Sequence, residues 1–152
     1  MKLIAEPLEV VHQCGKRWLA DTQTGYQGCD HKVEVKGFIE DMAAVYSWAD
    51  IIICRSGAMT VAEVAAVGLA SILVPYPAAV DDHQTANGAF LVDAGAAVLI
   101  QESDVNASDL AQRIQNMDRD FLKNMACNAR RVARRDATDR VVEVLTAEEV
   151  AA

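Results

Sequence analysis

The chain has 152 residues, of which 52% are hydrophobic and 24% are charged, and its formal net charge is −8. This composition is too apolar for a disordered protein, and we expect residues 1–152 to form a single domain with its own core. The negative charge argues against nucleic-acid binding by the surface as a whole. The sequence has no apolar run near the ~20 residues that are needed to cross a bilayer.

Strand-like and helix-like patterns alternate along the chain. The run "DIIIC" is typical of a strand buried on both faces of a parallel sheet. "TVAEVAAVG" reads as a helix that Gly68 closes, and Gly95 ends the next helix. Strands are expected over 8–15, ending in a turn, and over 33–38, 50–54, 70–77 and 96–102, and helices over 16–24, 41–49, 60–68, 84–95, 107–117, 119–135 and 138–150. This alternation predicts an α/β fold in which helices flank a parallel sheet.

The four cysteines form no C-x-x-C pair and match no zinc-binding spacing. We therefore expect reduced thiols in a cytosolic protein. We expect no signal peptide in the first residues, "MKLIAEPLEVV", because Glu6 and Glu9 interrupt the apolar stretch.

A cluster of basic residues near the C-terminus contrasts with the acidic composition. It fits a solvated helix face, and it also fits a patch for anionic lipid or a partner protein. The cluster consists of Arg119, Lys123, Arg130, Arg131, Arg134, Arg135 and Arg140.

Ligands of such sheets bind outside the carboxyl ends of the strands. Four segments should therefore meet at one edge: the turn after His12 and Gln13, Gly37–Met42, Arg55–Thr60, and Tyr76–Gln84.

The segment Arg55–Glu63 joins an apolar strand to a helix. Gly57 lets a ligand approach the backbone, and the helix start favours an anion such as a phosphate, with hydroxyl donors from Ser56 and Thr60. A structural alternative is a capping box, in which Thr60 and Glu63 cap the helix without any ligand. The sequence has neither G-x-G-x-x-G nor a Walker A motif.

Two other segments leave alternatives open. Asp81, Asp82, His83 and Gln84 suit polar contacts to a sugar, metal ligands, a nucleophilic triad or a helix cap, although the partners that a metal or triad would need are missing. At Ile39, a flat base can bond the backbone, or Phe38 and Ile39 can simply close the core. His12 and His31 are expected to be partly buried histidines.

Three strings in this sequence resemble the C-terminal half of the MurG family of UDP-N-acetylglucosamine:lipid I N-acetylglucosaminyltransferases. They are "HQCGK", "FIEDMAAVYSWADIIICRSGAMTVAEVAAVGLASILVPYP" and "DDHQTANGAFLVDAGAA", and the likeness runs from about Pro7 to Val144. "CRSGAMTVAE" followed by "DDHQTAN" is its most specific part. The resemblance implies a Rossmann-like domain, the donor-binding half of a GT-B glycosyltransferase.

The resemblance also implies site residues. The backbone at Ile39 matches the family's uracil contact, with Met42 beside it, and Glu63 matches the acid that binds the ribose hydroxyls. Arg55 matches a family arginine to which we assign no role. The remaining matches are to the diphosphate site, at Ser56, Gly57, Ala58, Met59 and Thr60, and to the N-acetylglucosamine contacts, at His83 and Gln84.

The implied reaction is an inverting transfer of N-acetylglucosamine from UDP to the 4-hydroxyl of lipid I, which makes lipid II for peptidoglycan. It implies no cofactor and no metal, and it places the full enzyme on the cytoplasmic face of the bacterial inner membrane as a peripheral protein. The family's acceptor domain, with its membrane patch and general base, and a glycine-rich phosphate turn have no counterpart in this sequence. We therefore expect no catalytic residue here and a soluble fragment with little activity alone. The alternatives are a donor-binding subunit of a two-chain transferase and a non-catalytic nucleotide-sugar-binding module.

Overall fold

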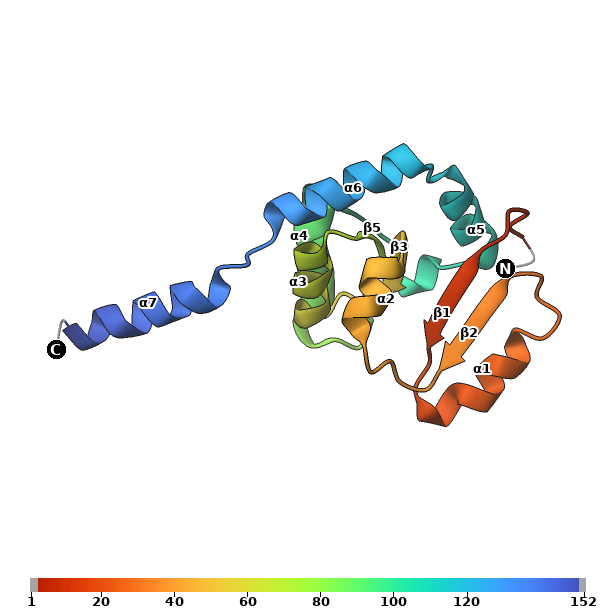
Figure 1. Ribbon diagram of the computed structural model, residues 1–152, viewed down its shortest axis with the longest axis horizontal. Coiled ribbons are helices and arrows are strands. Elements are labelled where there is room, and N and C mark those ends of the chain that lie inside the picture. Colours follow the sequence, from red (N-terminus) through yellow and green to blue (C-terminus); the bar gives the residue numbers. More distant parts are fainter. Residues whose placement is uncertain (1–2, 151–152) are drawn as a thin grey trace. The chain divides into compact units, whose positions relative to one another are not determined.

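The structure is a computed structural model that describes residues 3–150 (Figure 1). Strands and helices alternate as the sequence predicts, and the last three elements are helices. The chain divides into two compact units, residues 3–49 with 103–121 and residues 50–102 with 122–150. Each unit is described separately, and the expectation of one domain over 1–152 stays a prediction.

In the first unit, strand β1 (Glu9–Gln13) pairs in parallel with β2 (Lys32–Lys36). A 3-10 turn (Lys16–Trp18) and helix α1 (Leu19–Gly25) connect the two strands. The short helix α2 (Met42–Trp48) follows, and the N–H of Ala44 donates to Oδ1 of its N-cap residue, Asp41, at 2.9 Å. Helix α5 (Ala107–Asn116) also belongs to this unit.

The two faces of the β1–β2 pair differ because successive side chains alternate. On one face, Nδ1 of His12 lies 3.0 Å from the hydroxyl of Tyr26, just after α1. Glu9 and Lys32, which are opposite each other, form an ion pair at 3.0 Å. In β2 the half-buried Val33 and Val35 alternate with the exposed Lys32 and Glu34.

In the second unit, β3 (Ile51–Cys54), β4 (Ala70–Leu73) and β5 (Ala97–Leu99) form a parallel sheet in the order β3-β4-β5. Helices α3 (Ala58–Val67) and α4 (His83–Asp93) alternate with these strands, and a 3-10 turn (Val80–Asp82) leads into α4. After another 3-10 turn (Glu102–Asp104) and α5, the chain continues through α6 (Arg119–Val132) and α7 (Ala137–Val150).

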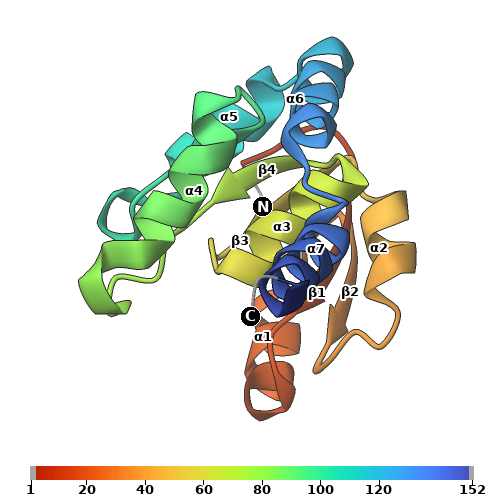
Figure 2. The same ribbon diagram turned by 90° about the vertical axis from the view of Figure 1, so that its left-hand side faces the viewer.

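The core of the second unit lies around β4, whose four residues are all buried. Helices α3 and α4 pack against each other, and α4 also packs on β5. Figure 2 shows α3 and α4 together with the central strand β4. Gly68 ends α3 with φ 76° and its N–H donates to the carbonyls of Val64 and Ala65, which confirms the predicted glycine cap. Gly95, with φ 68°, follows the end of α4 in the same way.

The predicted α/β fold, with parallel strands flanked by helices, is confirmed, and the strands pair as β1-β2 and as β3-β4-β5. One sequence expectation needs correction. The strand "DIIIC" is not buried on both faces, since the side chain of Ile53 is 45% exposed. The reason is its position, because β3 is at the edge of its three-stranded sheet while β4 is at the centre. Of the helices within residues 3–150, none combines the length and apolarity required for a bilayer span.

Candidate functional site

The carboxyl ends of β3 and β4 lie side by side in the second unit. Cys54 is opposite Leu73 in the ladder, and the N–H of Val74 donates to the carbonyl of Cys54 at 2.8 Å. The chain then leaves β3 through Arg55, Ser56 and Gly57 and enters α3. Two of the segments predicted to meet at a sheet edge, Arg55–Thr60 and the loop from Tyr76, therefore start next to each other.

Helix α3 begins earlier than the predicted capping box requires. Its N-cap is Gly57, in extended backbone (φ −62°, ψ 147°), and the N–H of Val61 donates to the Gly57 carbonyl at 2.9 Å. Thr60 is thus the third residue of the helix and cannot be its cap, so the capping box is wrong. Because glycine has no side chain, no side-chain cap exists here within residues 3–150, and the N–H groups of Ala58, Met59 and Thr60 face the helix start.

Ser56 is the buried part of this turn. Its side chain is fully buried, and within the described part of the chain its Oγ has no hydrogen-bond partner. Nδ2 of Asn87, on α4, donates to the Ser56 carbonyl at 3.3 Å. Gly88 makes the close approach possible, since a Cβ there would lie 3.4 Å from Cβ of Ser56 and 2.7 Å from Cδ1 of Leu99. The predicted contact between the Ser56 hydroxyl and a diphosphate stays a prediction. In the same turn, the side chain of Met59 is 74% exposed.

Arg55 makes contacts at the ends of three strands. Its Nη1 donates to the carbonyls of Val74 at 3.3 Å and Pro75 at 2.9 Å, just beyond β4. The same nitrogen pairs with Glu102, which follows β5. The guanidinium also lies over the ring of Tyr76, with 5.5 Å from Cζ to the ring centroid. Arg55 therefore connects the end of β3 to the residues that follow β4 and β5.

The loop that leads into α4 has an unusual backbone. Asp81 and Asp82 both have positive φ values, 52° and 51°. Asp82 is the N-cap of α4, as one alternative for this segment predicted, but its Oδ1 accepts from the hydroxyl of Thr85 at 2.7 Å, and no backbone N–H of the helix donates to it. Left-handed conformations at two adjacent residues other than glycine are strained, and such strain concentrates at ligand sites.

Gln84 is oriented by this loop. The N–H of Tyr76 donates to Oε1 of Gln84 at 2.9 Å, so the amide oxygen is occupied and Nε2 remains as the donor of the side chain. The preceding residue, His83, is exposed at the first position of α4. The structure thus connects the predicted diphosphate segment to the predicted sugar-contacting segment through Arg55, Tyr76 and Gln84.

Ile39 and Met42 lie in the first unit. Ile39 is 7% exposed, and its N–H donates to Oε1 of Gln13 at 2.8 Å. Phe38, which we considered as a core residue, is 65% exposed, while Ile39 does close the core. Met42 is half-buried at the first position of α2.

Sequence reasoning missed four residues that organise these segments: Gln13, Tyr76, Asn87 and Glu102. Asn87 is part of the string "DDHQTAN", which marked it without showing its role. Gln13 and Tyr76 lie in or beside segments that the sequence places at the sheet edge. Their contacts, like that of Glu102, have no signal in one sequence, because each joins residues that are separated in the chain.

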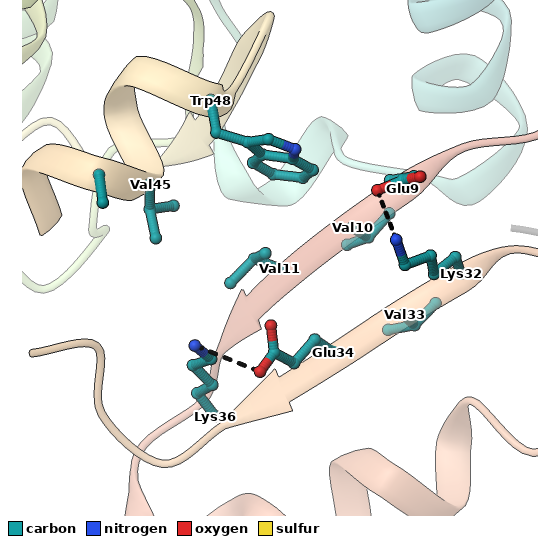
Figure 3. A pocket seen from close by; sticks show the side chains of 10 residues that line it. Glu9, Val10, Val11, Lys32, Val33, Glu34, Lys36, Val45 and Trp48 are labelled. Carbon is teal, nitrogen blue, oxygen red and sulfur yellow. Dashed lines mark hydrogen bonds and ion pairs between the residues drawn. The ribbon is translucent and has the colours of Figure 1, made fainter. Parts of the chain in front are cut away.

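A groove of about 440 Å³ lies in the first unit between α2 and the β1–β2 pair (Figure 3). Trp48 and Val45 of α2 face Val11 of β1, beside the ion pairs of the sheet, Glu9 with Lys32 and Glu34 with Lys36. None of the residues that we predicted to contact a ligand lines this groove.

The chemistry of the remaining titratable groups is limited. Burial raises the pKa of the Cys54 thiol to about 11, so this thiol stays protonated at neutral pH. Burial also raises the pKa of Tyr26, with further contributions from Cys29 and Cys14. Among residues 3–150, no group of three or more His, Cys, Asp or Glu side chains is arranged to hold a metal ion.

Comparison with curated proteins identifies close relatives. A protein of Polynucleobacter asymbioticus is 50% identical over 142 residues, and one of Shewanella amazonensis is 52% identical over 143. Each is named UDP-N-acetylglucosamine–N-acetylmuramyl-(pentapeptide) pyrophosphoryl-undecaprenol N-acetylglucosamine transferase. The match covers 91% of this chain and 40% of each relative, so the chain spans well under half of their length.

Solved structures of glycosyltransferases are also similar to this chain. The crystal structure of Acinetobacter baumannii MurG superposes with a TM-score of 0.91 at 46% identity, over 95% of this chain and 43% of that one. The glycosyltransferase VinC, at 17% identity and a TM-score of 0.65 over 86% of this chain and 31% of that one, supports the fold alone. The model of the glycosyltransferase family 28 C-terminal domain matches residues 2–141. The chain therefore belongs to the family of glycosyltransferase family 28 C-terminal domains.

Proposed function

We propose that this chain binds UDP-N-acetylglucosamine as the donor half of the transferase that converts lipid I to lipid II. The observation that carries the proposal is the uncapped start of α3, in a chain about 50% identical to relatives named as N-acetylglucosamine transferases. Those names support the proposed identity of the donor, and the uncapped helix start supports the proposed position of the diphosphate.

The diphosphate is proposed to sit at the first turn of α3. The N–H groups of Ala58, Met59 and Thr60 point out of the helix start, where the helix dipole favours negative charge. Gly57 lets the phosphate oxygens approach the backbone, and Thr60 adds a hydroxyl. The Ser56 backbone lies in the same turn, fixed from behind by Asn87.

Two side chains extend the proposed site along the donor. Glu63 is on α3 three residues after Thr60, so the two share one face of the helix, and its exposed carboxylate suits the two ribose hydroxyls. Nε2 of Gln84 is a donor for an oxygen of the sugar, and His83 is proposed as its neighbour in the same role. Ile39 is proposed to bond uracil through its backbone, with Met42 beside it.

In the reaction, this half of the enzyme positions the donor and stabilises the charge that grows on the leaving UDP. Backbone N–H groups and the dipole of α3 supply that stabilisation without a metal. The proposal assigns the acceptor, the general base and contact with the cytoplasmic membrane surface to the part of the relatives that this chain does not match.

Calorimetry with UDP-N-acetylglucosamine, UDP and GDP tests donor binding. We expect both uridine ligands to bind and GDP to bind at least ~10-fold more weakly. Glu63→Ala should weaken both uridine ligands ~10-fold or more, as the loss of hydrogen bonds to a charged group predicts. Glu143→Ala, which removes an exposed glutamate of α7, is the control. Equal binding of UDP and GDP would contradict the proposal.

A transferase assay tests the division of labour. The chain alone, given UDP-N-acetylglucosamine and lipid I, should turn over at least ~10²-fold more slowly than a full-length relative, because the general base is proposed to lie in the part of the relatives that this chain does not match. Turnover close to that of the relative would show that this chain contains its own catalytic groups.

A further inference from the structure

We propose that Arg55 is a positioning residue that sets the sugar specificity of the site by holding the loop that orients Gln84. This inference rests on the proposed function and adds a role to it. Arg55 directly precedes the segment matched to the diphosphate site, and its guanidinium contacts the carbonyls of Val74 and Pro75, the carboxylate of Glu102 and the ring of Tyr76.

The geometry connects Arg55 to the sugar end of the site in two steps. Nη1 holds the carbonyl of Pro75, and the guanidinium covers the ring of Tyr76, so the backbone of the loop is fixed where it leaves β4. The N–H of Tyr76 then holds Oε1 of Gln84 at 2.9 Å. The direction in which Gln84 presents Nε2 therefore depends on the position of the Tyr76 backbone.

Glu102, at the start of the 3-10 turn that follows β5, completes this arrangement. It pairs with the guanidinium, and its neighbour Gln101 donates through Nε2 to the hydroxyl of Thr85 at 3.2 Å. Thr85 in turn donates to Asp82, one of the two residues with positive φ. The loop is thus held at both ends, by Arg55 before the strained pair and by Gln101 after it.

A planar guanidinium is suited to this task. One nitrogen reaches two carbonyls and a carboxylate while the plane lies over an aromatic ring, a combination that the single ammonium group of lysine cannot reproduce. If Arg55 instead contacted a phosphate directly, its removal would weaken the binding of UDP and of UDP-N-acetylglucosamine equally.

The test is the ratio of the dissociation constants for UDP-N-acetylglucosamine and UDP, measured by calorimetry on the 152-residue chain. Arg55→Ala should raise this ratio ~10-fold and change the Kd of UDP by less than ~2-fold. Glu102→Gln should also raise this ratio. Arg55→Lys should give a ratio between those of Arg55→Ala and the unmodified chain. Arg113→Ala, which breaks the comparably exposed pair with Asp109, is the control and should leave the ratio unchanged.

A double variant separates positioning from general structural damage. If Arg55 acts through Gln84, Arg55→Ala should change the ratio by less than ~2-fold when Gln84→Ala is already present. An unchanged ratio in Arg55→Ala and Glu102→Gln, equal losses for both ligands, or fully additive effects would each overturn the inference. If the unmodified chain binds neither ligand, the proposed function itself fails.

Discussion

The N–H of Ile39 donates to Oε1 of Gln13 at 2.8 Å, so the backbone donor assigned to uracil already has a partner in this structure. Gln13→Ala should remove that partner. The partly buried N–H would then lack a bond in the ligand-free protein, at a cost of about 1 kcal/mol in the free energy of unfolding. A ligand carbonyl would no longer compete with Gln13, so UDP should bind more tightly.

Urea denaturation and calorimetry with UDP measure the two effects of Gln13→Ala. Gln23→Ala, at an exposed position of α1, is the control and should change neither quantity. Weaker UDP binding with unchanged stability would show that Gln13 contacts the ligand and does not compete with it.

Gly68 should tolerate no side chain. It has φ 76°, and a Cβ there would lie 3.2 Å from the carbonyl oxygen of Ala126 and 3.1 Å from Cβ of Arg130. Gly68→Ala should therefore lower the free energy of unfolding by about 1–2 kcal/mol. Gly25→Ala, where a Cβ would meet open space, should be neutral or slightly stabilising in the same denaturation experiment. Equal stability of the two variants would contradict this packing.

The basic cluster is partly used inside the fold. Nη1 of Arg130 donates to the carbonyl of Val67 at 3.2 Å, and Nη2 of Arg135 donates to the carbonyl of Ala66 at 3.2 Å. The two accepting carbonyls belong to the last turn of α3. Arg130→Ala should cost about 0.5–1 kcal/mol of stability, since it removes a cation from a helix C-terminus. Arg134→Ala should cost less than about 0.5 kcal/mol in the same melting experiment. Larger losses for Arg134→Ala would contradict this capping role, and the lipid or partner patch stays a prediction.

The buried Cys54 thiol predicts a stability change at high pH. Its pKa is raised from 9.0 to about 11, so it stays protonated in the folded chain while the unfolded chain loses this proton near pH 9. The contribution of this thiol to the free energy of unfolding is therefore complete below pH 9 and is lost as the pH rises toward 11. The loss amounts to about 2 kcal/mol by pH 11. Denaturation at pH 8 and pH 11 should show this extra loss in the unmodified chain relative to Cys54→Ala. Parallel losses in both proteins would contradict it.

Much of the fold follows from local patterns. The apolar runs, the alternation in β2 and the cap at Gly68 each depend on residues close in sequence, and each is confirmed. The capping pattern "T-x-x-E" predicts an N-cap at Thr60, three residues after the observed N-cap Gly57. The hydrogen bond from the N–H of Val61 to the Gly57 carbonyl shows that the helix begins at Ala58.

The candidate site was predictable in its residues but not in its connections. The resemblance supplied Glu63, Gln84 and the turn at Gly57, and their roles stay predictions. Arg55 and Glu102 are 47 positions apart in the sequence, so their ion pair has no local sequence signature. The pair forms only because β3 and β5 lie on either side of β4. The contact between Gln13 and Ile39 also lacks a local signature.

The central claim is that the uncapped first turn of α3 holds the diphosphate of a uridine diphosphate sugar. Titration of the ¹⁵N-labelled chain with UDP-N-acetylglucosamine, followed by amide chemical shifts, tests it most directly. The account predicts that the amides of Ala58, Met59 and Thr60 shift most within the second unit, and that inorganic diphosphate shifts the same signals. Binding that leaves these three amides unchanged while signals elsewhere move would contradict it.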